Sequence, residues 1–198
     1  MRKLTYFIGM TIDGCIAGPD DEYDFMVAFA TDEHSAEYSA ALQASHPDTL
    51  PTHIRPYLGL GPENRDFDTV VMGRGTYDPG LKEGITSPYA HLKQYVVSKS
   101  ITTSPDPDVT VFSGDPVDLV RDLKTQDGKA IWLCGGANLA GQLREEIDEL
   151  VVKIYPFVAG DGIRLFSSTT FAPERYDLRE TRSFANGAVV LRYVKRAG

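Results

Sequence analysis

Two segments of the chain place glycine directly after a run of apolar, strand-forming residues and before a helix-compatible segment. Residues 69–77 read TVVMGRGTY, and residues 131–140 read IWLCGGANLA. Glycine lets the backbone turn sharply and approach a ligand, and the helix start behind it offers N–H groups and a positive dipole end to an anion. Two such turns indicate a ligand with several phosphates, although each alone is also typical of an ordinary strand-to-helix turn.

A short strand between the two turns ends in hydroxyls and a cation. Residues 95–100 read YVVSKS, so Ser98 and Lys99 stand where an acid would bind the ribose hydroxyls of NADH. A hydroxyl and an ammonium group at this place favour an extra phosphate, as on NADPH. The alternative is an exposed strand end without a ligand.

A fourth segment, residues 9–18, reads GMTIDGCIAG and follows the first apolar run. In this order and spacing, the four segments resemble those of the dihydrofolate reductase-like superfamily. The closer resemblance is to the branch related to the reductase domain of the bifunctional riboflavin-biosynthesis deaminase/reductase, and it extends from Leu4 to Val194. It implies an α/β fold with a mostly parallel central sheet, flanking helices and a C-terminal antiparallel hairpin. It also implies NADPH-dependent reduction of a small substrate.

The resemblance assigns a cofactor site residue by residue. The front loop would lie beside the nicotinamide and its ribose, the glycine turns would hold the phosphates, and the strand end would hold the phosphate on the adenosine ribose. The positions are Thr11, Asp13, Gly14, Ile16 and Ala17 in the front loop, Gly73, Arg74 and Thr76 in the first turn, Ser98 and Lys99 at the strand end, and Gly135, Gly136, Ala137 and Asn138 in the second turn. Core packing is the alternative for Ile16 and Ala17, and a bond to its own turn backbone is the alternative for Asp13.

Reduction of a C=N or C=O bond needs a proton as well as a hydride. Dihydrofolate reductases supply or relay this proton through an acid on the first helix, and the matching residues 20–25 read DDEYDF. Asp24, just before the aromatic Phe25, is the predicted catalytic residue. Because three further acids stand in the same stretch, a solvated acidic loop is the alternative.

Two departures from the family pattern leave the substrate open. Cys15 stands where related proteins often carry an aromatic residue, and residues 45–66 contain four prolines and no hydrophobic period. This insertion is either a lid or a surface loop without a role. The substrate is a pteridine such as dihydrofolate, a ribosylaminopyrimidine phosphate of the riboflavin route, or another small carbonyl or imine. His53 and Arg55 are candidates for a substrate phosphate if the insertion folds over the site.

Composition predicts one domain, residues 1–198, in a reducing cytoplasm. A chain of 198 residues that is 42% hydrophobic can bury a core, and its net charge of −8 argues against binding to nucleic acid or an anionic membrane. Its two cysteines are too few for a disulfide framework, and its four histidines lack metal-ligand spacing, so no metal site is expected. The first apolar run is short for a signal peptide, and no stretch approaches the roughly 20 apolar residues of a membrane helix.

Hydrophobic patterning predicts that strands alternate with helices and that a hairpin around Asn186 and Gly187 ends the chain. Thr31 is expected to cap the second of two helices within residues 22–44. The expected strands are 4–11, 69–72, 94–97, 109–112, 130–133, 149–158, 176–184 and 188–195, with a loop at 13–21 and helices after Gly73, Pro116 and Gly136.

Two functions from other classes stay open. One is a module that binds a dinucleotide without oxidising it, and the other is a structural dimer subunit whose C-terminal strands supply the contact surface. For the enzyme, the expected partners are a small-molecule substrate and a second copy in a homodimer.

Overall fold

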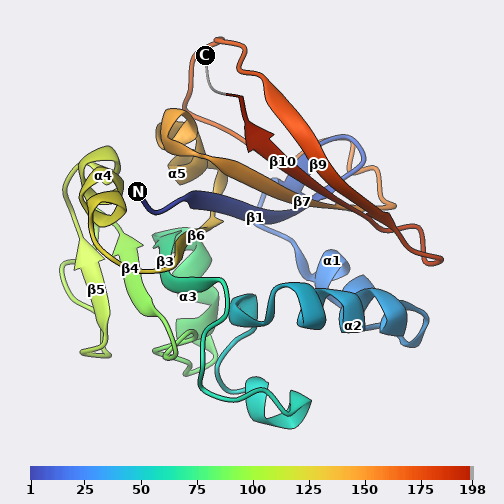
Figure 1. The fold of residues 1–198 in the computed structure, drawn as a ribbon, viewed down its shortest axis with the longest axis horizontal. Helices are drawn as coiled ribbons and strands as arrows, with labels where there is room; N and C mark the ends of the chain where they lie inside the picture. The colour runs from blue at the N-terminus through green and yellow to red at the C-terminus, as the bar shows by residue number, and fades with distance from the viewer. Residues whose placement is uncertain (197–198) are drawn as a thin grey trace.

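The computed structural model describes residues 1–196, and an eight-stranded sheet forms its centre (Figure 1). The strands lie in the order β5-β4-β3-β6-β1-β7-β10-β9. Their bounds are β1 Leu4–Thr11, β3 Phe67–Gly73, β4 Lys93–Val97, β5 Val109–Phe112, β6 Ala130–Gly135, β7 Glu149–Tyr155, β9 Tyr176–Ser183 and β10 Val189–Lys195. The first six of these strands are mutually parallel, whereas β10 runs antiparallel to β7 and β9. The predicted sheet and hairpin are confirmed, and Gly187 adopts φ +89° at the hairpin turn.

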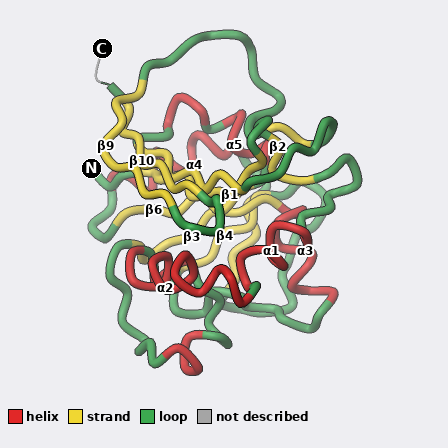
Figure 2. Tube along the Cα trace, turned by 90° about the vertical axis from the view of Figure 1, so that its right-hand side faces the viewer, coloured by secondary structure: helices red, strands yellow, loops and turns green. Residues whose placement is uncertain are grey.

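Helices cover both faces of this sheet, as Figures 1 and 2 show. One face carries α4 and α5, and the other carries α1, α2 and α3. The bounds are α1 Asp24–Thr31, α2 Ala36–Ser45, α3 Arg74–Lys82, α4 Pro116–Thr125 and α5 Ala137–Gln142. Successive side chains of a strand point to opposite faces. Tyr6 of β1 therefore packs in the core under α4 and α5, whereas Phe7 packs in the core under α3.

Helix α4 shows how local sequence sets an element. The Asp115 carboxylate accepts a hydrogen bond from the Val117 N–H at 2.8 Å, and Pro116 occupies the first helical position. Leu119 and Leu123, one turn apart, are buried against the sheet.

Two local predictions were wrong. Thr31 ends α1 rather than capping α2, and its hydroxyl donates back to the Val27 carbonyl. Asp32 caps the 3₁₀ turn η1 Glu33–Ser35 instead. The front loop contains a strand, β2 Cys15–Ala17, because it pairs with β8 Ile163–Arg164, which is far away in sequence.

The insertion at residues 45–66 is ordered around two buried charged side chains, and it lies in teal beyond α2 and α3 at the bottom of Figure 1. It contains the short helices η2 Pro47–Thr49 and η3 Arg55–Leu58. Asp48 accepts the N–H groups of Asp66 and Phe67 at 2.6 and 3.0 Å, which fastens the insertion to β3. Arg55 donates to three backbone carbonyls within the insertion and is 3% exposed. The guanidinium group is therefore held inside the fold, which argues against Arg55 as a candidate for binding a substrate phosphate.

Candidate functional site

The segments that the sequence singled out meet at one edge of the sheet. Strands β4, β3, β6 and β1 are neighbours and parallel, so their carboxyl ends lie side by side. At these ends, β4 leads to Ser98, β3 and β6 lead to the two glycine turns, and β1 leads into the front loop. Ligands of open α/β sheets bind at this edge.

The two glycine turns pack against each other. A Cβ atom on Gly73 would lie 3.6 Å from the carbonyl oxygen of Gly135, and a Cβ on Gly136 would lie 3.8 Å from Thr76 Oγ1. Gly135 has φ +127°, a conformation that side chains disfavour, and the peptide bond to Gly136 is cis. Gly136 itself has φ −93° and ψ −159°, which any residue can adopt. The backbone of Gly136 therefore does not require glycine, whereas close approach of a ligand would.

Arg74 connects the first glycine turn to the end of β4. Its guanidinium group donates to Ser100 Oγ at 2.7 Å and pairs with Asp78 at 3.1 Å. The Ser98 hydroxyl is buried and accepts the Ser100 N–H at 3.2 Å, so this side chain shapes the turn that carries the exposed Lys99. The structure thus places two cations, Arg74 and Lys99, at the same corner.

Asp13 fastens the front loop to the segment after β7. Its carboxylate accepts the Thr11 hydroxyl and the N–H groups of Ala159 and Gly160, the last two at 3.0 and 2.8 Å. These hydrogen bonds hold the pKa of the Asp13 carboxyl group well below its usual value, and the bond from Thr11 has the largest effect. The carboxylate of Asp13 is therefore engaged by the Thr11 hydroxyl and by a segment that is remote in sequence, rather than by the backbone of its own turn. Thr11 and Ala17 of the same loop are buried.

Asp24 is the first residue of α1, and it is exposed. Glu22 belongs to the preceding turn, where its carboxylate accepts the Asp20 N–H at 2.8 Å. Within residues 1–196, Asp24 forms no side-chain hydrogen bond or ion pair, so its carboxylate is available for a ligand. Among these residues, no hydrogen bond connects Asp24 to the glycine turns. Of the acids in residues 20–24, only Asp24 lies on the helix.

Sequence reasoning missed a group of side chains around the ring of Phe7. This Phe7 cluster consists of Phe7, His46, Tyr89, Trp132, Cys134 and Lys153. The ring centroid of Phe7 is 4.8 Å from that of His46 and 6.5 Å from that of Trp132, and Lys153 Nζ lies 4.2 Å from it. Burial raises the pKa of the Cys134 thiol to about 12. The members come from segments that are distant in sequence, so no local sequence motif indicates the cluster.

His46 gives a testable pH dependence. Burial lowers the pKa of its imidazole to about 4, although the nearby Asp66 carboxylate acts in the opposite direction. The His46 imidazole has an ordinary pKa of about 6.5 in the unfolded chain. Between the two pKa values, it therefore binds a proton in the unfolded chain that it does not bind in the folded protein. As pH falls from about 6.5 to about 4, the free energy of unfolding should drop by about 1–3 kcal/mol through this group. Urea unfolding of the wild type and of His46→Phe at several pH values measures it.

His34→Phe is the matched control, because the His34 side chain is 81% exposed. We expect this control to keep the acid sensitivity of the wild type and His46→Phe to lose that part of it. Parallel curves for all three proteins would show that His46 does not contribute.

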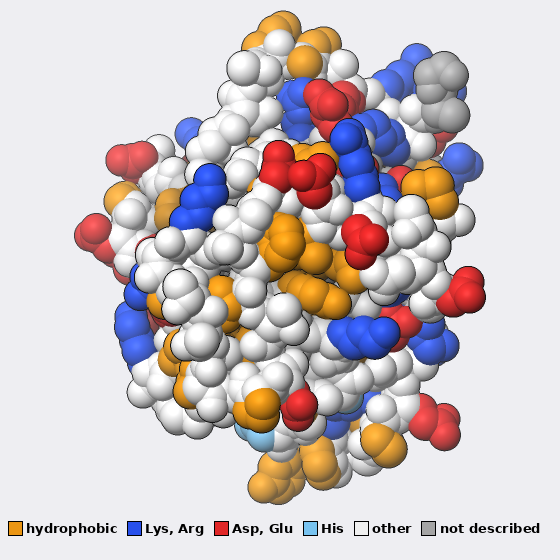
Figure 3. Space-filling model, turned by 90° about the vertical axis from the view of Figure 1, so that its left-hand side faces the viewer, with side chains coloured by type: hydrophobic (Ala, Val, Ile, Leu, Met, Phe, Trp, Pro, Cys, Tyr) orange, Lys and Arg blue, Asp and Glu red, His pale blue; other side chains and the backbone are white. Residues whose placement is uncertain are grey.

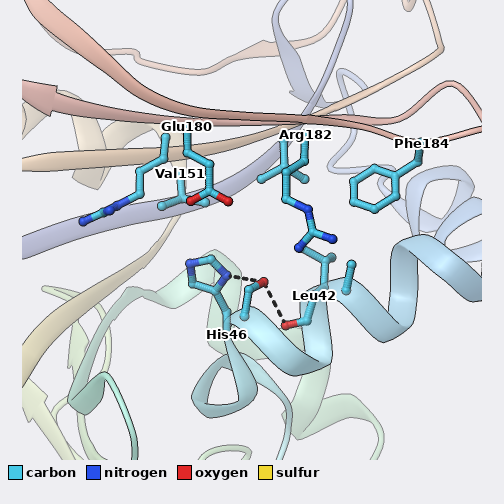
Figure 4. A pocket seen from close by; sticks show the side chains of 10 residues that line it. Leu42, His46, Val151, Glu180, Arg182 and Phe184 are labelled. Atoms are coloured by element: carbon cyan, nitrogen blue, oxygen red, sulfur yellow. Dashed lines mark hydrogen bonds between the residues drawn. The ribbon is translucent and has the colours of Figure 1, made fainter.

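A small pocket, partly open to solvent, lies between α2 and strands β7, β10 and β9 (Figure 4). Leu42, Val151 and Phe184 give it apolar walls, and the side chains of Glu180 and Arg182 extend from β9 toward α2. None of its lining residues belongs to the glycine turns or the front loop. The pocket is therefore separate from the predicted cofactor site.

On the face with α4 and β5, acidic and basic side chains are interspersed (Figure 3). This face therefore carries no extended patch of a single charge. Within residues 1–196, no helix combines the length and the apolar character needed to cross a membrane.

Comparison with known proteins places this geometry in a family. The model of the RibD C-terminal domain matches residues 2–190. The uncharacterized protein YwjB of Bacillus subtilis (strain 168) is 29% identical over 196 residues, which cover 98% of each chain.

Two solved structures share the fold at low sequence identity. A crystal structure from Shewanella sp. PV-4, assigned to riboflavin biosynthesis, has a TM-score of 0.72 at 20% identity, with 98% of this chain and 99% of that chain covered. The diaminohydroxyphosphoribosylaminopyrimidine deaminase/5-amino-6-(5-phosphoribosylamino)uracil reductase of Thermotoga maritima has a TM-score of 0.65 at 13% identity, with 98% of this chain and 57% of that chain covered. The chain described here belongs to the RibD C-terminal domain family.

Proposed function

We propose that the protein is an NADPH-dependent reductase of a small substrate, similar in reaction to 5-amino-6-(5-phosphoribosylamino)uracil reductase. The observation that carries the proposal is the packing of the two glycine turns against each other, with Arg74 and Lys99 at the adjoining corner. Backbone without side chains and two cations together suit a ligand with several phosphates.

The residues present fit this cofactor. Gly73 and Gly136 would let the pyrophosphate approach the backbone, and Arg74 and Lys99 would pair with the phosphate on the adenosine ribose. When bound, NADPH supplies the hydride. The front loop, which Asp13 holds in place, would orient the nicotinamide and exclude water. Asp24 would supply or relay the proton.

The direct test is a screen for oxidation of NADPH, followed by absorbance, with three substrate types. These are dihydrofolate, the ribosylaminouracil phosphate of the riboflavin route, and a panel of small carbonyls and imines. Calorimetric titration with NADPH accompanies the screen. Oxidation with any substrate supports a reductase, and binding without oxidation supports a module that only holds the dinucleotide. A protein that binds no dinucleotide would contradict the proposal.

Lys99→Ala should reduce the preference for NADPH over NADH. An ammonium group paired with a phosphate contributes roughly 1–3 kcal/mol, so we expect the difference in binding free energy between the two dinucleotides to shrink by that amount. Lys93→Ala is the control, because Lys93 is exposed at the start of β4, the strand that precedes Lys99. Calorimetric titration of both variants measures the effect, and equal affinities for NADPH and NADH in the wild type would overturn the assignment of Lys99.

A further inference from the structure

The Phe7 cluster lies next to the proposed nicotinamide position. Cys134 directly precedes Gly135 of the second glycine turn, and Lys153 pairs across β1 and β7 with Gly9, two residues before Thr11 of the front loop. A substrate must lie against the nicotinamide to accept its hydride. The cluster is therefore in position to form one wall of the substrate site.

Lys153 is a half-buried cation without an anion. Within residues 1–196 it forms no ion pair and no hydrogen bond, and its Nζ instead lies 4.2 Å from the ring centroid of Phe7. Other buried or half-buried cations of this acidic chain do have carboxylate partners, as in the pairs of Arg2 with Asp68 and of Arg192 with Glu149. Withdrawing a cation from water without a counter-charge is unfavourable. An anionic ligand would remove this penalty.

The rest of the cluster is suited to a flat ligand. Tyr89 and Trp132 stand edge to face with centroids 4.7 Å apart, and the His46 ring is tilted by 41° against that of Phe7. The Nε1–H of Trp132 is buried and finds no acceptor among residues 1–196. Aromatic walls favour planar molecules, and a donor without an acceptor in the same cluster favours an oxygen on such a molecule.

We propose that Lys153 contacts the substrate and selects planar heterocycles that carry an anionic oxygen, to which its ammonium group donates a charge-assisted hydrogen bond. This proposal rests on the proposed reductase function. It makes Lys153 a specificity-determining residue and leaves the supply of the proton to Asp24.

The test uses orotate and uracil as probes, because these two flat pyrimidines differ by one carboxylate. Trp132 is the only tryptophan of the chain, so its fluorescence reports binding at the cluster without any turnover. We expect orotate to bind the NADPH-loaded wild type more tightly than uracil does. Lys153→Met should weaken orotate roughly 10- to 100-fold and leave uracil within about twofold, and Lys153→Arg should retain most of the preference.

Lys93→Met is the matched control and should behave as the wild type. Circular dichroism confirms that each variant is folded. Lack of orotate binding to the wild type, or an unchanged preference in Lys153→Met, would overturn the role of Lys153. Calorimetric titration with NADPH separates the two proposals, because retained NADPH binding with no selection for orotate refutes only the role of Lys153. Absence of NADPH binding refutes the reductase itself.

Discussion

Gly136→Val is expected to abolish measurable NADPH binding in a protein that still folds. The residue has extended backbone angles, which valine favours, and the nearest atom to a Cβ there is Thr76 Oγ1 at 3.8 Å. The fold therefore tolerates the side chain, whereas a pyrophosphate drawn against the backbone would collide with it. We expect the dissociation constant to rise by at least about 100-fold, close to 2.8 kcal/mol.

Gly61→Ala is the control for this variant, because a Cβ at Gly61 meets no atom within 4 Å and the position lies in the insertion. Calorimetric titration with NADPH and circular dichroism are measured on both variants and the wild type. Wild-type affinity in a folded Gly136→Val protein would show that the second glycine turn is only structural, and it would remove the main support for the cofactor assignment.

The sequence predicted those parts of the fold in which local pattern and final packing agree. Apolar runs such as residues 69–72 are buried on both faces of the sheet, and Asn186 with Gly187 encodes the hairpin through its own turn geometry. The prediction that Thr31 caps the second helix was wrong because Asp32, the next residue, is also a favourable N-cap and lies at the break between the helices. Strand β2 was missed because its hydrogen bonds go to β8, a partner that no window around residues 13–21 contains.

The same distinction applies to the site. Glycine junctions are local, so the sequence located both turns, and the parallel sheet then brought them into contact. Two of the three groups that donate to the Asp13 carboxylate, the N–H groups of Ala159 and Gly160, lie more than 140 residues away, and these contacts could not be foreseen from the turn alone. Lys153 belongs to no sequence motif, and only the structure shows that it lies over the ring of Phe7 and has no ion-pair partner among residues 1–196. Residues that act through tertiary contacts need the structure.

Asp24→Asn should slow turnover by roughly 10²- to 10⁴-fold, which is the usual contribution of a general acid, while NADPH affinity stays unchanged. Asp24 begins α1 with a free, exposed carboxylate, and Tyr23 before it lies close enough to Tyr89 of the Phe7 cluster to help raise the pKa of that phenol, after burial and Cys134. This contribution places the start of α1 near the proposed substrate wall, where Asp24 would supply the proton.

Asp20→Asn is the matched comparison for this experiment, because Asp20 is also an exposed aspartate but lies in the loop before the helix. Steady-state rates of both variants are measured from pH 5 to 8 on whichever substrate proves active, together with calorimetric titration of NADPH. If Asp24 supplies the proton, the asparagine variant should recover part of its rate at low pH, where hydronium can protonate the substrate directly. A wild-type rate and pH profile in Asp24→Asn would exclude this residue from the mechanism, and a large defect in Asp20→Asn instead would move the acid into the loop before α1.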